Sequence, residues 1–546
     1  MKVKFILTAA FLAGAALSSM AQTHVEGEEY YKADQLANAK ELLHRNMNNA
    51  GTDKSISDYY LGMIALSEGN KGEAGKWFDE GVKANPNYAY NYVGQGALKL
   101  LAKDKKAAED LFKQAEKLAK KDPGLEIAIA RAYYEADPVA YQKEIDKKVE
   151  KARKINMMDA DVFLFEGDVA KDKKDFGKAA SMYQMAADNN SEATEAYVKY
   201  ANLFTQVNQQ YAIDMLSKLL GLHPDSALAQ RELANAYYNA GKFKEAAQQY
   251  GDYIKNPNHF KSDEDRYAFL LFYGGNYQDG YNYSTALLNA DPNNFTAQRY
   301  QFMNAAQIES MADQLLPMAE ALNAKHLADP AKNKLAPIDY ILMAQEFNSA
   351  KRPQEAEAVL QEAINDDPEN PEFYKQLAMT YVRENNLSKA ADTFEGYLSH
   401  VEKPSYNDFV QQATFAYYAG VENQKTNPEA SAKYYQMTRD YAAKAHEILP
   451  NNYKPLKFEG DIAKQTASED QIASAAVPFY TESIALLEAS ENPARYANDA
   501  KDMYNYMGNY YLDQKDVAKA KEYFNKYLQY DPNNDAYRKF VEGLKE

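Results

Sequence analysis

The chain repeats the stretch IDYILMAQEFNSAKRPQEAEAVLQEAI (residues 338–364) as EFYKQLAMTYVRENNLSKAADTFEGYL (residues 372–398), 34 residues later. Apolar and small residues stand at the same places in both copies. Within each copy they follow spacings of three and four, interrupted by a polar turn such as Glu384-Asn385-Asn386. Each copy therefore predicts two helices that fold back on one another.

The pattern also fixes where small and large side chains stand. Ala378 and Ala390 lie where the two helices of one hairpin must approach closely, whereas Tyr381 and Phe394 fill the space between hairpins. This order of small, aromatic and closing proline residues resembles the tetratricopeptide repeat. The resemblance implies an all-α fold: a right-handed superhelical solenoid of antiparallel helix hairpins.

The pattern covers nearly all of residues 22–546, in about 12 to 14 repeats of which some are degenerate. We expect one solenoid block over residues 22–292 and a second over residues 336–534. Residues 293–335 lack the small-residue pattern and are interpreted as a degenerate hairpin that serves as a hinge. Residues 535–546 are expected to form a capping helix over the last repeat, as stacked arrays require.

Residues 1–21 are typical of a cleavable secretory signal. Lys2 and Lys4 precede the apolar run of residues 5–17, and Ser19-Met20-Ala21 forms a cleavage site before Gln22. We therefore expect export and cleavage after Ala21. The expected location is the periplasm, with secretion and association with the outer membrane as alternatives.

The net charge bears on the class of partner, and the cysteine content bears on disulfides and on membrane anchoring. The formal net charge is −17, and loss of residues 1–21, which hold two lysines and no acid, makes it −19. Such acidity argues against nucleic acid. No cysteine is present, so we expect neither disulfides nor a cysteine-linked lipid anchor. No later stretch is long and apolar enough to span a membrane. A protein or peptide partner is what the family resemblance implies.

The sequence carries no motif for catalysis. None of the seven histidines has a second one three or four residues away; His223 and His259 fall at loops of neighbouring hairpins, but no third metal ligand is identifiable. Gly94-Gln95-Gly96 lacks the third glycine of a nucleotide loop and is interpreted as helix packing. We expect no enzyme activity, no cofactor and no metal.

Tyrosine is unusually common, with 45 residues against one tryptophan. The family resemblance implies that first-helix positions line a concave groove, and tyrosine combines a large contact area with a polar tip. The alternative is that these tyrosines only pack between neighbouring first helices. The groove candidates are Tyr59, Tyr90, Arg231, Asn235, Gln345, Lys375, Asn505, Tyr506 and Asn509.

The resemblance implies a non-enzymatic scaffold that binds a partner segment in the groove. Some members of the family grip a carboxyl-terminal tail with lysine and asparagine residues on successive first helices, and only Arg231 and Asn235 resemble that arrangement here. The leading hypothesis is an adaptor of the cell envelope. The competing hypothesis is a protein that binds glycan or peptidoglycan through groove tyrosines and asparagines.

Overall fold

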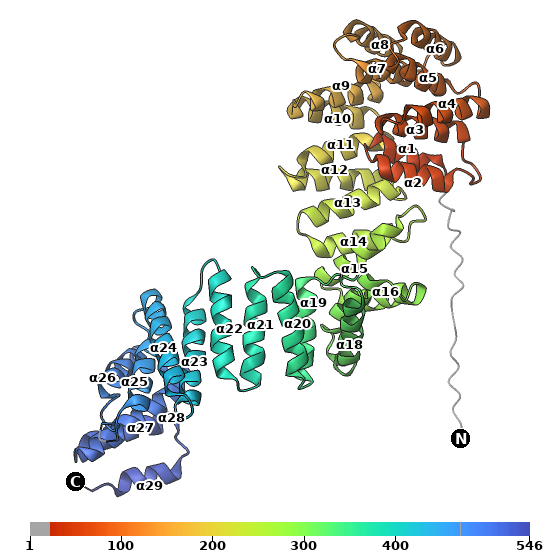
Figure 1. Ribbon diagram of the computed structural model, residues 1–546. Coiled ribbons are helices and arrows are strands. Elements are labelled where there is room, and N and C mark those ends of the chain that lie inside the picture. Colours follow the sequence, from red (N-terminus) through yellow and green to blue (C-terminus); the bar gives the residue numbers. More distant parts are fainter. Residues whose placement is uncertain (1–21, 470, 546) are drawn as a thin grey trace, which may run out of the picture. The chain divides into compact units, whose positions relative to one another are not determined.

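The computed structural model describes residues 22–469 and 471–545, so the expected signal segment lies outside the described residues. Within these ranges the fold is all-α, with 29 α-helices, three 3-10 helices and no strand. The helices pair as successive antiparallel hairpins, which confirms the predicted fold class (Figure 1). Among the described helices, none combines the length and apolar character that crossing a bilayer requires.

The chain divides into two compact units, one ending at Asn304 and the other beginning at Ala305. This division falls within residues 293–335, for which the sequence predicts a hinge. The hinge itself stays a prediction. The first unit contains the following helices: α1 (His24–Lys32), α2 (Leu36–Asn46), α3 (Lys54–Ser67), α4 (Lys71–Ala84), α5 (Ala89–Leu101), α6 (Lys105–Leu118), α7 (Pro123–Ala136), α8 (Gln142–Ile155), α9 (Ala160–Asp172), α10 (Phe176–Asn189), α11 (Thr194–Phe204), α12 (Gln209–Leu222), α13 (Ala227–Asn239), α14 (Phe243–Tyr253), η1 (Lys261–Asp263), α15 (Glu264–Tyr273), α16 (Tyr277–Ala290) and α17 (Phe295–Ala305).

The second unit is built in the same way. Its repeated stretch forms the hairpins α19/α20 and α21/α22, as the 34-residue spacing predicts. The helices of this unit are η2 (Glu309–Met311), α18 (Ala312–Ala328), α19 (Pro337–Ser349), α20 (Pro353–Asp366), α21 (Pro371–Arg383), α22 (Leu387–His400), α23 (Tyr406–Asn423), α24 (Pro428–Ile448), α25 (Lys454–Thr466), α26 (Val477–Glu488), η3 (Pro493–Tyr496), α27 (Ala497–Asp513), α28 (Val517–Tyr530) and α29 (Asp535–Gly543).

In many hairpins, a two-residue turn connects the first helix to the second. A residue with positive φ ends the first helix, and the next residue caps the second. Asn385 has a φ of 57°, and the side chain of Asn386 then accepts a hydrogen bond from the backbone N–H of Lys389. Gly69 and Asn70 do the same between α3 and α4. Glycine and asparagine tolerate this left-handed backbone, and asparagine is a preferred cap.

The core follows the alternation of small and large residues that the sequence predicts. Ala378, Ala390 and Phe394 are fully buried. In the first unit the Phe78 ring lies between two glycines, because a Cβ on either Gly62 or Gly94 would come within 2.3 Å of its Cε1 atom. The interpretation of Gly94 as a packing glycine is therefore confirmed.

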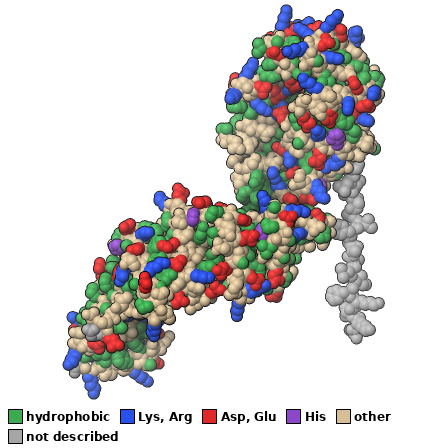
Figure 2. All heavy atoms as spheres, in the orientation of Figure 1, with side chains coloured by type: hydrophobic (Ala, Val, Ile, Leu, Met, Phe, Trp, Pro, Cys, Tyr) green, Lys and Arg blue, Asp and Glu red, His purple; other side chains and the backbone are tan. Residues whose placement is uncertain are grey.

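The last helix, α29, packs its Val541 side chain against the final hairpin of the second unit. Elsewhere the helices present polar faces to solvent. On the face drawn in Figure 2, basic and acidic side chains are interspersed over both units. This mixing is typical of solvated helix faces, so the features that distinguish the protein must be sought in its hollows.

Candidate functional site

The first hairpin of the N-terminal unit packs against helices that lie far along the chain. Helix α1 contacts α11 and α13 (Figure 1). The fully buried Tyr30 ring meets the Phe260 ring edge-on at a centroid distance of 5.3 Å. Asn46 donates a hydrogen bond to the side chain of Asn258, 212 residues away, at 3.4 Å. We call this contact of residues 22–46 with α9, α11, α13 and residues 256–263 the seam.

Charged and polar groups hold the seam together. Asp34 forms ion pairs with Lys171 at 3.2 Å and with Lys199 at 3.0 Å. Ser226 donates a hydrogen bond to Glu29 at 3.0 Å. Burial raises the pKa of Glu29 to about 7, although this hydrogen bond opposes the shift. The seam thus closes a turn of the solenoid with interactions between residues more than 130 positions apart in the sequence.

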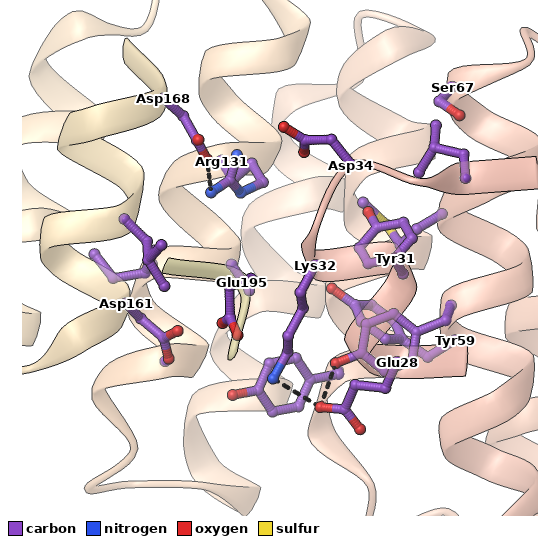
Figure 3. A pocket seen from close by; sticks show the side chains of 18 of the residues that line it. Glu28, Tyr31, Lys32, Asp34, Tyr59, Ser67, Arg131, Asp161, Asp168 and Glu195 are labelled. Carbon is purple, nitrogen blue, oxygen red and sulfur yellow. Dashed lines mark hydrogen bonds and ion pairs between the residues drawn. The ribbon is translucent and has the colours of Figure 1, made fainter. Parts of the chain in front are cut away.

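Closure of the turn leaves a cavity of about 400 Å³ inside the N-terminal unit (Figure 3). The first helices of six hairpins line it: α1, α3, α5, α7, α9 and α11. These are the positions that the family resemblance assigns to a concave groove. The groove of this unit is therefore a partly open chamber, with one wall of tyrosines and another of charged side chains.

Five tyrosines form the aromatic wall. Tyr59 lies at its centre, with ring centroids 5.0 Å from Tyr60, 6.2 Å from Tyr88 and 5.5 Å from Tyr90. Tyr31 extends the wall, 4.9 Å from Tyr60. The hydroxyl of Tyr60 donates to Glu28 at 2.9 Å. The rings are thus fixed by packing and by hydrogen bonds before any ligand arrives.

The cationic side chains of the cavity are held in ion pairs. Lys32 binds Glu28 at 2.8 Å. Arg131 and Lys199 both bind Asp168, at 2.7 and 2.9 Å. Burial alone raises the pKa of Asp168, but these two positive charges outweigh it and hold the pKa at about 2. Asp168 is therefore ionised throughout the physiological range.

Three carboxylates of the cavity have no such partner. Within the described residues, Glu135, Asp161 and Glu195 form no ion pair within 4 Å and no side-chain hydrogen bond with another residue. Desolvation raises the pKa of each of them, since burial disfavours the charged form. Glu195 is only 6% exposed, and what remains accessible faces the cavity. The chamber thus carries an excess of negative charge.

The cavity brings together only some of the candidates that the sequence singled out. Tyr59 and Tyr90 line it, as expected of groove residues. Arg231 does not: it lies in the seam, where its guanidinium binds Asp263 at 2.6 Å and Gln35 at 3.2 Å. Asn235, on the same helix, accepts a hydrogen bond from Arg266 at 3.1 Å.

The remaining candidates lie in the second unit and do not gather at one place. Gln345 is exposed on α19. Lys375, on α21, lies over the Tyr397 ring at 5.3 Å. Tyr506 donates to the carbonyl of Ile472, and Asn505 accepts from Tyr537 and contacts Asn509. In the second unit these candidates are therefore polar side chains distributed over α19, α21 and α27.

Sequence reasoning missed the charged residues of the cavity. One signal could have found them: Asp161 and Glu195 stand 34 residues apart, at the same place in neighbouring repeats. Each is embedded among residues that the repeat pattern buries, such as Val162 and Ala196. Within the described residues, no group of three or more histidine, aspartate or glutamate side chains is arranged to hold a metal ion.

Comparison with models of known families finds matches in three parts of the chain. Models of the tetratricopeptide repeat match residues 210–259, 348–413 and 502–534. The matched stretches are tetratricopeptide repeats, as the repeat pattern predicted, and they lie in both units. The presence of these repeats supports a role of the chain as a protein–protein interaction scaffold. No curated protein matches the chain as a whole.

Several solved structures are similar to this chain at low identity. The C-terminal part of a tetratricopeptide repeat-containing protein from Cytophaga hutchinsonii is 19% identical, with a TM-score of 0.41; the match covers 52% of this chain and 100% of that one. A tetratricopeptide repeat protein from Parabacteroides merdae is 16% identical, with a TM-score of 0.34, over 48% and 96% of the two chains. Yeast Tom70 is 14% identical, with a TM-score of 0.29, over 95% and 98%.

Proposed function

We propose that this protein is a non-enzymatic adaptor of the cell envelope that binds a segment of a partner protein in the cavity of its N-terminal unit. The observation that carries the proposal is the chamber itself. Six first helices converge on it, its tyrosine wall is rigid, and three of its carboxylates are unpaired. Binding pockets share this combination of concavity, aromatic surface and a few unsatisfied polar groups.

The envelope location rests on the sequence alone. A basic start, an apolar run and a small-residue cleavage site support export, and the net charge supports a protein partner over nucleic acid. Fractionation of cells that produce the protein should place it outside the cytoplasm. Amino-terminal sequencing should then find Gln22 as the first residue; a mature protein that still begins at Met1 would contradict export by cleavage.

The direct test uses substitutions whose larger side chains fill the cavity. Gly124 lines it, and a Cβ there would come within 2.6 Å of the Asp161 carboxylate and 3.0 Å of the Tyr90 hydroxyl. Gly124→Leu should therefore occupy the space meant for the ligand. Ala128→Leu, one turn further along α7, is a second filling variant in case the first one fails to fold. Gly177→Leu is the matched control, since a Cβ on α10 meets no atom closer than 4.0 Å.

Tagged protein would be cross-linked in envelopes and purified with its partners. Proteins captured by the parent and by Gly177→Leu, but lost with either filling variant, would support the adaptor. Capture that survives both folded filling variants would mean that the cavity is not the binding site.

The tyrosine wall also favours a second candidate, a glycan or peptidoglycan fragment, because sugar rings stack on aromatic faces. The same variants separate the two candidates. Retention of the parent on isolated cell-wall material, lost with Gly124→Leu, together with an empty protein capture, would favour the glycan.

A further inference from the structure

We propose that the cavity of the N-terminal unit receives a positively charged side chain of the partner segment, an arginine guanidinium or a lysine ammonium, between the tyrosine wall and the carboxylates of Asp161 and Glu195. This inference rests on the proposed function and adds the chemistry of recognition.

The charge balance of the cavity is the first argument. Its three cations are engaged by Glu28, Asp34 and Asp168, which leaves three carboxylates over. Of the three, Glu195 is buried, Asp161 is half-buried and Glu135 is exposed. A buried carboxylate without an ion pair is costly, since burial removes its hydration, and the more distant cations of the cavity offset only part of that cost for Glu195. The structure thus keeps a deficit of positive charge along this cavity, and a cationic ligand would correct it.

Glu195 is the second argument, because it is a buried acid that points into the space. Figure 3 shows the side chains of Glu195, from α11, and Asp161, from α9, directed toward the same part of the cavity. The Lys32 ammonium is bonded to Glu28 at 2.8 Å, and its charge also lowers the pKa of Asp161 and of Glu195, though by less than burial raises it. The two carboxylates repel one another, and this repulsion adds to the effect of burial in raising the pKa of Glu195. A bound cation would relieve both.

Space at this point is provided by a glycine. Gly124 begins the first turn of α7, and its missing side chain leaves the Asp161 carboxylate and the Tyr90 hydroxyl exposed to the cavity. A planar guanidinium could donate to the carboxylate while it rests on a tyrosine ring. Arginine combines forked donors with a face that stacks on aromatic rings, so it fits better than a compact ammonium.

The tyrosine wall supplies the other half of the recognition. Tyr59 is 6% exposed, and the Glu135 carboxylate lies near enough to raise the pKa of its hydroxyl further than burial does alone. Tyrosine rings present a negative face to a cation. Tyr59 and Tyr31, together with Glu135, therefore favour a positive charge, as the carboxylates of Asp161 and Glu195 do. Both sides of the cavity thus select a cation.

The test measures binding of defined probes to the full exported chain. The first probe is a fluorescein-labelled, capped Gly/Ser peptide with a single central arginine. The second probe is the same peptide with the arginine replaced by its neutral isostere citrulline. The third probe is spermidine, a free polyamine. We expect the arginine peptide to bind at least about tenfold more tightly than the citrulline peptide, as hydrogen bonds to charged groups predict. Its affinity should also fall with added salt.

Two isosteric variants test whether the bound arginine contacts the carboxylates of Glu195 and Asp161. Glu195→Gln and Asp161→Asn should each weaken the arginine peptide about tenfold. Glu195→Gln should also raise the Tm of the N-terminal unit, because it removes a buried charge that has no ion pair. A merely structural carboxylate would lower Tm instead. Glu150→Gln is the matched control, since Glu150 is exposed and pairs with Lys154 on the outer face of α8; it should leave affinity unchanged.

The outcomes separate the inference from the function on which it rests. Equal affinity for the arginine and citrulline peptides, or unchanged binding in both variants, would overturn the cationic ligand even if Gly124→Leu still abolishes partner capture. Binding of spermidine that depends on Glu195 and exceeds that of the peptide would support the cation site with a free polyamine as its source. Tighter binding of an otherwise identical aspartate peptide would overturn the inference.

Discussion

Arg231 offers the sharpest test of the seam, because the sequence assigns it to the groove and the structure places it elsewhere. Its guanidinium donates two hydrogen bonds to Asp263, at 2.6 and 3.3 Å, and a third to Gln35 at 3.2 Å. It also lies over the Phe260 ring at 5.4 Å. Gln35 belongs to the first hairpin, so this one side chain ties the first hairpin to the seventh.

Arg231→Ala should therefore destabilise the N-terminal unit. The side chain of Asp263 is only 7% exposed, and without Arg231 it would keep the hydroxyl of Tyr253, at 3.0 Å, as a partner. Removing one partner of a buried ion pair costs about 3–5 kcal/mol, because the remaining charge is left without compensation. For a unit of this size that corresponds to a fall in Tm of roughly 10 °C.

The assay combines thermal unfolding with hydrogen exchange resolved by peptide. Exchange should rise in α1, α2 and η1, which meet at the seam, and remain unchanged in α5 and α6 on the far side of the turn. Arg266→Ala is the matched control. Arg266 is exposed and bonds only to neighbours on its own side of the seam, so its loss should change stability by less than about 1 kcal/mol.

A double variant measures the interaction between Arg231 and Asp263 separately from their other contacts. Arg231→Ala with Asp263→Ala should recover part of the loss, because no buried charge is then left unpaired. If Arg231→Ala left Tm and exchange unchanged while it abolished partner capture, the seam assignment would be wrong, and Arg231 would be a groove residue as its sequence position suggests.

Three further predictions concern the same unit. Asp58 is fully buried with both carboxylate oxygens unpartnered, and burial raises its pKa to about 6, so Asp58→Leu should raise the free energy of unfolding by about 2–3 kcal/mol at pH 8; a loss of stability would contradict this. Glu29 binds its proton more tightly in the folded state, with a pKa of about 7 against an ordinary 4.5, so the stability that it contributes should fall as pH rises from 4.5 to 7, and Glu29→Gln should flatten the unfolding profile measured across that window. Gly94→Ala should cost about 1–3 kcal/mol in chemical denaturation, since Phe78 is already confined by a second glycine, whereas Gly177→Ala on an open helix face should be neutral or stabilising.

The repeat architecture could be predicted because its cause is local. Ala378 is small where two helices of a hairpin meet, Tyr381 is large where hairpins stack, and both requirements recur every 34 residues. The turn at Asn385 is equally local, since one residue with positive φ and one capping side chain define it. Such signals lie within a few residues of the structure that they specify.

The candidate site could be predicted only in part. Tyr59 and Tyr90 were identified because a tyrosine on a first helix has an evident use at a concave surface. Asp161 and Glu195 were passed over because solvation is the default for an acid on a helix, and their 34-residue spacing alone does not show that they are buried. Their burial depends on the seam, whose contacts, such as Asn46 with Asn258, join residues some 200 positions apart.

The seam and the acid excess are therefore physically linked. In an open turn of the solenoid, Asp161 and Glu195 would face water, their charge would be screened, and a cation would gain little from them. Closure by the first hairpin lowers the local polarity and strengthens every charge–charge interaction within the chamber. Interactions as remote from the ligand as the pairing of Asp34 with Lys171 and Lys199 thus set how strongly the cavity attracts a positive charge. In this protein the selectivity of the groove is a property of the closed turn as much as of the side chains that line it.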